Sequence, residues 1–124
     1  MLNVKKILIV DDEPEILLLI SEVIKSGAKK EYKPEITQAE NGDKALALLQ
    51  GDKFDIVVID YRMPGLSGME VITAARNEGM TLPFICMSGH LDAVDIPDDL
   101  RDVYFIPKPF DSLEFLKALR IAMT

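Results

Sequence analysis

Short apolar runs alternate along the chain with longer stretches in which apolar residues recur at helical spacing. Such short runs predict β-strands. The first two are nearly continuous and rich in β-branched residues, which is typical of central strands covered on both faces. A weaker segment over residues 34–39 is predicted to form a strand at an edge of the sheet. The four clear runs cover residues 7–10, 54–59, 82–87 and 103–106.

Two helices are predicted in the first half of the chain, over residues 14–27 and 42–49. Pro14 suits the first position of a helix, and the apolar residues after it keep one side apolar as far as Gly27. Further along, Ser67 with Glu70 fits a capping box, in which each side chain bonds the backbone N–H of the other residue. This pair predicts a helix that runs to residue 79.

A last helix is predicted after Asp111, which with Glu114 resembles a second capping box. Between the last two strands, residues 91–102 are predicted to hold only a short or broken helix. Ile96 precedes Pro97 and is biased away from helical dihedrals, whereas Pro97 suits the first turn of a new helix. Strands and helices therefore alternate five times, which predicts parallel strands in a doubly wound α/β sandwich.

Composition and charge narrow the class of protein. The 124 residues, 48% of them hydrophobic, predict one soluble globular domain over residues 1–124. The net charge of -7 argues against nucleic acid and anionic membranes, because both require clustered positive charge. Cys86, the one cysteine, lies in an apolar run and is interpreted as a buried structural thiol. The first apolar run is too short for a signal or membrane segment, so a cytoplasmic location is expected.

Polar residues follow four of the predicted strands: Asp11 with Asp12, then Asp60, Ser88 and Lys108. Ligands bind outside the carboxyl ends of strands in such sheets, so these side chains are expected at one rim. Clustered carboxylates repel one another and favour either proton uptake or a divalent cation. Of the cations, Mg²⁺ fits best, because it prefers hard oxygen ligands and joins carboxylates to phosphate. Asp60 is the candidate nucleophile toward phosphorus, with Lys108 and Ser88 beside the phosphoryl oxygens.

Each of these residues also has a purely structural interpretation. Asp11 and Asp12 could cap the following helix, and Asp60 could start a turn. Their predicted convergence with a hydroxyl and a lysine favours the functional interpretation, because a reacting group needs several partners at one point.

The ordered motifs resemble the response-regulator receiver domain of two-component signalling, over essentially the whole chain. The resemblance implies a five-stranded, flavodoxin-like parallel sheet of strand order 2-1-3-4-5 with helices on both faces. The motifs are the run at residues 7–12, Asp60 followed by Met63-Pro64-Gly65 and Gly68, Ser88-Gly89, and Lys108-Pro109-Phe110.

The resemblance also implies roles for the acids and the lysine. Asp60 is the implied phosphoacceptor and a Mg²⁺ ligand. Asp12 is implied as the direct carboxylate ligand, Asp11 as a ligand through water, and Arg62 as a ligand through its main-chain carbonyl. Lys108 is implied to pair with the phosphoryl group, and its bond to the next proline is expected to be cis.

Other implied roles concern the output of the signal. Ser88 is the implied switch hydroxyl. Phe105 falls where the family places a rotating aromatic, and an ordinary core or edge-strand aromatic is the alternative. Arg62 and His90 are predicted to tune the lifetime of the phosphoryl group, with a plain loop residue as the alternative for His90. Pro107 and the short segment at residues 90–102 depart from the family pattern.

The resulting hypothesis is a Mg²⁺-dependent switch, not a conventional enzyme. It would receive its phosphoryl group from a histidine kinase or phosphotransfer protein and pass the signal to an unidentified downstream protein. A phosphatase with an aspartyl-phosphate intermediate is less favoured, because Arg62 stands where a second acid would be needed. A pseudo-receiver that only binds partners is also less favoured, because the acidic set is intact.

Overall fold

The computed structural model describes residues 2–89 and 102–124, which form five strands and four helices. The strands are β1 (Val4–Val10), β2 (Lys33–Ala39), β3 (Ile56–Asp60), β4 (Phe84–Ser88) and β5 (Tyr104–Pro107). The helices are α1 (Pro14–Ala28), α2 (Gly42–Gly51), α3 (Gly68–Asn77) and α4 (Ser112–Ala122). The predicted short helix lies outside the described residues, except for Asp102.

All five strands are parallel and lie in the order β2-β1-β3-β4-β5, which confirms the doubly wound, flavodoxin-like sheet. β1 and β3 are central, as their apolar sequences predict, and every residue of β3 is buried. β2 forms one edge, also as predicted, and β5 forms the other. Pro107 has no N–H to donate, and its position in an edge strand is one that tolerates this loss.

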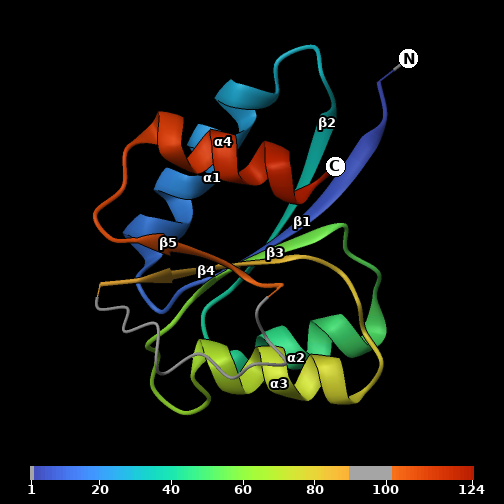
Figure 1. Cartoon of the computed structure of the whole chain (residues 1–124), viewed down its shortest axis with the longest axis vertical. Coiled ribbons are helices and arrows are strands. Elements are labelled where there is room, and N and C mark those ends of the chain that lie inside the picture. The colour runs from blue at the N-terminus through green and yellow to red at the C-terminus, as the bar shows by residue number, and fades with distance from the viewer. Residues whose placement is uncertain (1, 90–101) are drawn as a thin grey trace.

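Helices cover both faces of the sheet, with α1 and α4 on one face and α2 and α3 on the other (Figure 1). Alternate residues of a strand point to opposite faces, so β1 contributes to two separate cores. Leu8 and Val10 pack beneath α2 and α3, whereas Ile7 and Ile9 pack beneath α1 and α4. These two apolar layers hold the carboxyl ends of the strands, and hence the residues that follow them, in fixed positions.

Local signals set the starts of the helices. α1 begins at Pro14, and α3 begins after the predicted capping box, in which Ser67 and Glu70 bond each other's backbone N–H. Asp111 accepts a hydrogen bond of 2.7 Å from the backbone N–H of Glu114, which is one half of the second predicted box. α3 ends two residues before Gly79, whose φ of 86° takes the chain out of the helix.

Candidate functional site

The predicted polar residues meet at the carboxyl edge of the sheet, beside β1, where the strand order reverses. Carboxylate oxygens of Asp11, Asp12 and Asp60 all lie within 4.8 Å of one another. The Nζ atom of Lys108 lies 3.1 Å from Asp60 Oδ1 and 3.4 Å from Asp11 Oδ2. Ser88 lines the same hollow, so the site brings together all five residues that the strand ends predicted.

The site is a buried floor with an exposed mouth. Asp11, Asp60 and Ser88 are exposed by only 0%, 7% and 2%, whereas Asp12 is exposed. The hollow above Asp60 has a volume of about 260 Å³. It has room for a phosphoryl group, and the exposed Asp12 lines it together with the buried Asp60. We call this hollow the acidic pocket.

Burial dominates the electrostatics of the two inner acids. It raises the pKa of Asp60, which Lys108 lowers and the charge of Asp12 raises further. It also raises the pKa of Asp11, and the opposing hydrogen bond from the backbone N–H of Glu13 does not cancel this effect. Burial, together with the charge of a neighbouring carboxylate, thus outweighs the charge of Lys108, and the pKa of each carboxyl group is raised.

Lys108 keeps its charge in this setting. Burial acts to lower its pKa, but the hydrogen bond with Asp60 and the charges of Asp11 and Asp60 outweigh burial, so the pKa is raised. The lysine backbone is also fixed, since its N–H donates a 2.7 Å hydrogen bond to the carbonyl of Ser88. The Lys108–Pro109 peptide bond is cis, as the resemblance implied.

The backbone at Asp60 depends on a close approach that only glycine permits. A Cβ atom on Gly68 would lie 2.4 Å from the carbonyl oxygen of Asp60, a distance that real Cβ atoms do not show. The N–H of Gly68 bonds the carbonyl of Tyr61 at 2.9 Å, which closes the loop between β3 and α3. The turn within this loop has Gly65 at a φ of 78°. The glycines of the sequence motif thus hold the loop against Asp60.

The remaining predicted residues have mixed outcomes. Arg62 lines the acidic pocket, and its backbone N–H bonds the Asp60 carboxylate. Phe105 is half-buried against the core beneath α2 and α3, while Tyr104 is 39% exposed on the opposite face, as strand alternation predicts. Whether Phe105 rotates stays a prediction. His90 lies outside the described residues.

Two lining residues were not predicted as part of the site, Glu13 and Tyr61. Glu13 contributes its backbone N–H, which bonds Asp11 Oδ1 at 2.9 Å. Tyr61 packs against the core with its backbone N–H bonded to the carbonyl of Met87 at 2.8 Å. Their sequence signal is position alone, since each directly follows a predicted acid.

Cys86 is a buried structural thiol, as its apolar sequence context predicted. Cys86 is fully buried in the core beneath α2 and α3, and burial raises its pKa to about 12. A thiol with this pKa is not a nucleophile at neutral pH.

The acidic pocket fits a divalent cation. Asp11, Asp12 and Asp60 are the one group of three or more potential metal-binding side chains found among residues 2–89 and 102–124. All the donors are hard oxygens, two of the acids are buried, and the third is open to solvent, which is the donor set that Mg²⁺ prefers.

Comparison with protein families gives a match over residues 7–120 to the response regulator receiver domain. The chain belongs to this family. Phosphoryl acceptance on an aspartate is the general function of its members, and they bind Mg²⁺ at an acidic pocket.

Sequence relatives support the assignment. Sporulation initiation phosphotransferase F of Bacillus subtilis is 30% identical over 118 residues, which cover 94% of this chain and 91% of that protein. The transcriptional regulatory protein YvrH of B. subtilis is 32% identical over 92% of this chain but only 47% of its own length. The sensor histidine kinase GacS of Pseudomonas protegens is 34% identical over 68% of this chain and 9% of its length. Apart from the phosphotransferase, these relatives are at least about twice as long as the region that matches.

Solved structures agree with the fold. The chemotaxis response regulator CheY4 of Vibrio cholerae superposes with a TM-score of 0.83 at 24% identity, covering 97% of this chain and 99% of that one. The response regulator TrrA of Thermotoga maritima, solved in complex with Mg²⁺ and BeF, gives a TM-score of 0.81 at 28% identity, covering 95% and 98%. Among the described residues, no helix combines the length and apolar character needed to cross a membrane.

Proposed function

We propose that Asp60 is the phosphoacceptor of this receiver domain. The observation that carries the proposal is the contact between the Asp60 carboxylate and Lys108 at 3.1 Å, on the floor of a hollow that opens to solvent at Asp12. Of the clustered acids, Asp60 is both buried and in direct line with the pocket, whereas Asp11 does not line it.

The reaction is a transfer of one phosphoryl group. An Asp60 carboxylate oxygen forms a bond to phosphorus as the donor's P–N bond (phosphohistidine) or P–O bond (acyl phosphate) breaks. The electron pair of the broken bond leaves with the donor. Lys108 pairs with a phosphoryl oxygen, and the Ser88 hydroxyl donates a hydrogen bond to another. The protein contributes position and charge, which makes it a switch that catalyses its own phosphorylation and dephosphorylation rather than an enzyme with turnover.

The same pocket would hold Mg²⁺. Asp12 and Asp60 would bind it through their carboxylates, Arg62 through its main-chain carbonyl, and Asp11 through water. The ion, when bound, supplies positive charge that neutralises the phosphoryl oxygens. Support comes from the three carboxylates within 4.8 Å, all of them hard oxygen donors, and from the burial of Asp11 and Asp60 beside the exposed Asp12.

Ser88 and Phe105 would transmit the signal. Their side chains would move when the phosphoryl group binds and would change the surface at β5. The proposed donor is a histidine kinase or a phosphotransfer protein, since relatives bear the names of a phosphotransferase and a sensor kinase. A downstream protein would read the switched surface. The proposal keeps the single domain over residues 1–124 and the cytoplasmic location expected from the sequence.

Arg62 and His90 are proposed to set the lifetime of the phosphoryl group. Arg62 lines the mouth of the acidic pocket, where water must enter to hydrolyse the acyl phosphate. A chase of the phosphorylated protein would compare wild type with Arg62→Ala and His90→Ala. Identical decay rates in all three would show that neither residue controls hydrolysis.

Labelling by acetyl phosphate tests the central assignment. The wild type is incubated with acetyl phosphate with and without Mg²⁺, and its intact mass is measured. We expect a gain of one phosphoryl group that depends on Mg²⁺. Asp60→Asn should show none, because the amide is nearly isosteric but a poor nucleophile, and circular dichroism should show an intact fold. Asp52→Asn, a surface control, should label normally. Full labelling of Asp60→Asn would refute the assignment.

A further inference from the structure

A second hollow lies at the amino edge of the sheet, opposite the acidic pocket. It is bounded by the start of β1 and the carboxyl-terminal ends of α1 and α4, and has a volume of about 210 Å³. Its inner wall is apolar and consists of Tyr32, Leu116, Leu119 and Met123. We call it the amino-edge hollow.

The two helices that bound the amino-edge hollow are held close together. Gly27 of α1 lines the hollow, and a Cβ atom at this position would lie 2.4 Å from the side chain of Leu116 on α4. Because the glycine lacks that atom, α4 can approach α1 and the apolar wall is built from side chains fixed in the core. Tyr32 and Leu119 are only 9% and 1% exposed. The hollow is therefore a preformed recess rather than a gap between mobile side chains.

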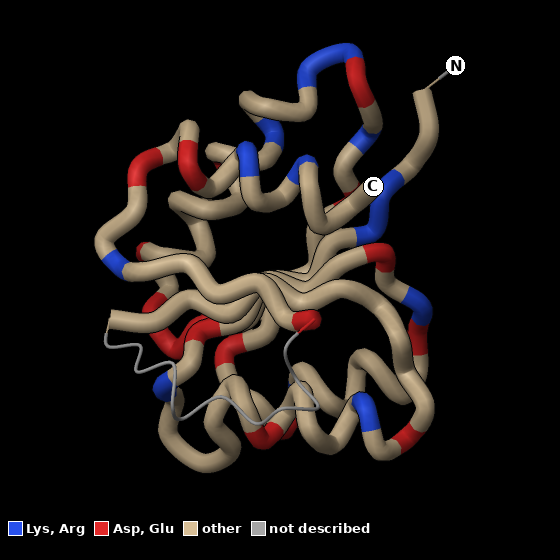
Figure 2. Tube along the Cα trace, viewed as in Figure 1, with Lys and Arg blue, Asp and Glu red and all other residues tan. Residues whose placement is uncertain are grey.

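Basic side chains surround this recess. Lys5 and Arg120 line it, and Lys29, Lys30 and Lys33 are exposed on the adjoining turn and at the start of β2. The turn is tied to the rim of the recess by a 2.8 Å hydrogen bond from the N–H of residue 33 to the carbonyl of residue 3. Figure 2 shows basic residues on the turn after α1, where an acidic one lies between them, and on the chain beside the C-terminus.

Most of this positive charge has no partner within the molecule. Arg120 pairs with Glu31 at 3.0 Å, but among residues 2–89 and 102–124 the other four basic residues, Lys5, Lys29, Lys30 and Lys33, form no ion pair. Glu31 also lines the hollow. The whole chain carries a net charge of -7, so a group of four lysines without an ion pair in the described part of the chain is a local exception. Uncompensated cations around an apolar recess attract an acidic ligand and steer its approach.

We infer that the amino-edge hollow is a docking site for an acidic segment of a partner protein, which places one aromatic side chain in the hollow, beside the contact between α1 and α4. The volume is below the roughly 300 Å³ at which pockets for drug-sized ligands begin, so it suits a single side chain. An aromatic ring fits because it gains most from a fixed apolar wall. Acidic residues on either side of the ring would meet Lys5 and the lysines of the turn.

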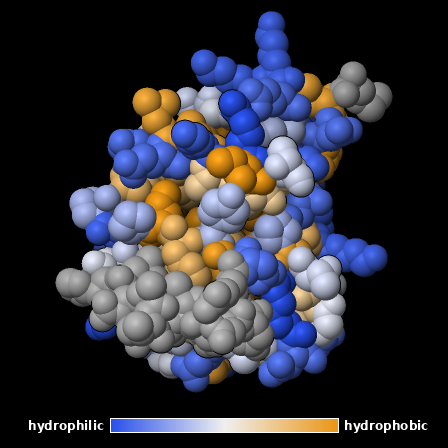
Figure 3. Space-filling model, viewed as in Figure 1, coloured by the Kyte–Doolittle hydropathy of each residue, from blue (hydrophilic) through white to orange (hydrophobic). Residues whose placement is uncertain are grey.

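The apolar side chains that line the hollow are recessed, which suits one inserted side chain of a peptide. Leu2, Val4 and Ile121, which adjoin lining residues in the sequence, are 44%, 50% and 46% exposed, so an anionic membrane is the alternative that the vesicle experiment tests. Hydrophilic residues border the apolar ones over α4 in the space-filling view (Figure 3). The inference is independent of phosphoryl transfer, because none of its residues lies in the acidic pocket.

Three short peptides test the inference with the full chain. The first has phenylalanine at its centre and two acidic residues on each side, the second replaces phenylalanine by alanine, and the third replaces the acids by lysine. Binding is followed by the backbone NMR shifts of the ¹⁵N-labelled protein. We expect the acidic phenylalanine peptide to bind tightest and to shift the amides of Gly27, Tyr32 and Leu119.

Charge variants complete the test. Lys5→Gln and Lys33→Gln should each weaken binding of the first peptide by about threefold, the effect of one exposed ion pair. Lys117→Gln, on α4 but outside the hollow, should not. Acetyl phosphate labelling should be unchanged in all three variants. Equal affinity for the three peptides, shifts confined to other surfaces, or binding to phosphatidylglycerol vesicles without binding to the peptide would each overturn the inference.

Discussion

A lysine contacts an aspartate both at the carboxyl ends of the strands and at their amino ends, but the surroundings of the two pairs differ. At the carboxyl edge Lys108 lies 3.1 Å from Asp60, and at the amino edge Lys6 lies 2.6 Å from Asp52. The side chain of Asp60 is 10% exposed and that of Asp52 is 49% exposed. The shorter contact is thus the more solvated one.

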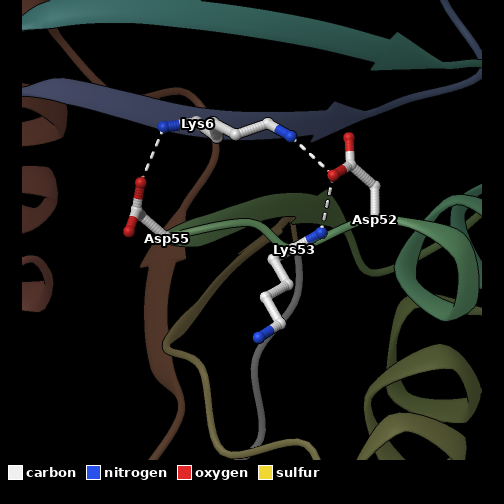
Figure 4. A network of polar contacts seen from close by, with 4 residues as sticks. All are labelled: Lys6, Asp52, Lys53 and Asp55. Carbon is white, nitrogen blue, oxygen red and sulfur yellow. Dashed lines mark hydrogen bonds and ion pairs between the residues drawn. The ribbon is translucent and has the colours of Figure 1, made fainter.

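The polar network at the amino edge has a local structural role (Figure 4). The backbone N–H of Lys6 donates to Asp55 at 2.7 Å, and the N–H of Asp55 donates to the carbonyl of Lys6 at 2.8 Å. Asp52 accepts from the Lys6 side chain and from the N–H of Lys53. These bonds tie β1 to the chain that enters β3, and the hydrogen bond from Lys6 lowers the pKa of Asp52.

The two pairs indicate that burial and crowding, rather than contact distance, set the direction in which the pKa of the acid shifts. Near solvent, a lysine stabilises the carboxylate and the pKa of the acid falls. In the acidic pocket, a lysine at contact distance does not offset burial and the other acids, so the pKa of Asp60 rises. A site in this condition favours uptake of a proton or binding of a divalent cation.

Replacement of each lysine should give the largest contrast. Lys108→Ala is expected to accept some phosphoryl group from acetyl phosphate but to lose the structural response, because no cationic side chain remains to link the phosphoryl charge to the loop after β5. Lys6→Ala should keep both the phosphorylation and the structural response. The measurement is the set of NMR shift changes on phosphorylation. A full shift pattern in Lys108→Ala would contradict the role given to this lysine.

Removal of the exposed acid at each edge should separate metal binding from surface charge. Asp12→Ala removes a proposed direct ligand and is expected to weaken Mg²⁺ binding by roughly tenfold or more. Asp52→Ala removes an equal charge far from the pocket and should leave Mg²⁺ affinity unchanged. Calorimetric titration decides between them. Equal affinities in the two variants would show that Asp12 acts only through long-range charge.

Alanine in place of a glycine should test the close approach behind Asp60. Gly68→Ala forces Cβ against the Asp60 carbonyl and is expected to lower the free energy of unfolding by about 1–3 kcal/mol. Gly51→Ala, at the amino-edge end of α2, meets no atom within 4 Å and should leave stability equal or slightly higher. Urea unfolding measures both. A neutral Gly68→Ala would show that the loop shifts without cost.

Neutralising one acid at each edge should have effects of opposite sign on stability. The pKa of Asp11 is raised, so its charge destabilises the fold above that pKa, and the wild type gains stability as pH falls through it. Asp11→Asn should therefore raise the free energy of unfolding at neutral pH in EDTA.

For Asp52 the expected change in the free energy of unfolding has the opposite sign. Its pKa is lowered, so its charge stabilises the fold above the unfolded pKa, and this stabilisation is lost as pH falls through the folded pKa. Asp52→Asn should therefore lower stability slightly at neutral pH and not at acidic pH. Urea unfolding at both pH values gives the comparison. Destabilisation of the same sign in both variants would contradict the electrostatic account of the pocket.

The sequence predicted strand type well and strand bounds less well. The apolar patterns predicted that β1 and β3 are central and that β2 is at an edge. A nearly continuous apolar run is typical of a strand buried on both faces, and a weaker one is typical of a strand at the edge of a sheet. β1 begins at Val4, before the apolar run, because Lys5 and Lys6 pair with β2 through their backbones while their side chains stay near solvent. β3 begins at Ile56 rather than at residue 54, since Asp55 bonds Lys6 instead of extending the strand.

The site residues were predictable because each follows a strand, and parallel topology brings the strand ends together. Their individual environments were not. Asp11 and Asp12 are adjacent in sequence, yet one is buried and the other exposed, because successive residues at the end of β1 point to different sides. Glu13 and Tyr61 were missed because they join the pocket through loop geometry and backbone N–H groups, which residue type does not reveal.

Direct mapping of the phosphorylated residue tests the central claim most closely. The wild type is labelled with acetyl phosphate and Mg²⁺, treated with borohydride to reduce the acyl phosphate to an alcohol, digested and sequenced by mass spectrometry. The account predicts that the modification lies at Asp60, with none at Asp52 or Asp55 of the amino edge. Modification at Asp11 or Asp12 in place of Asp60, or equally at both edges of the sheet, would contradict it.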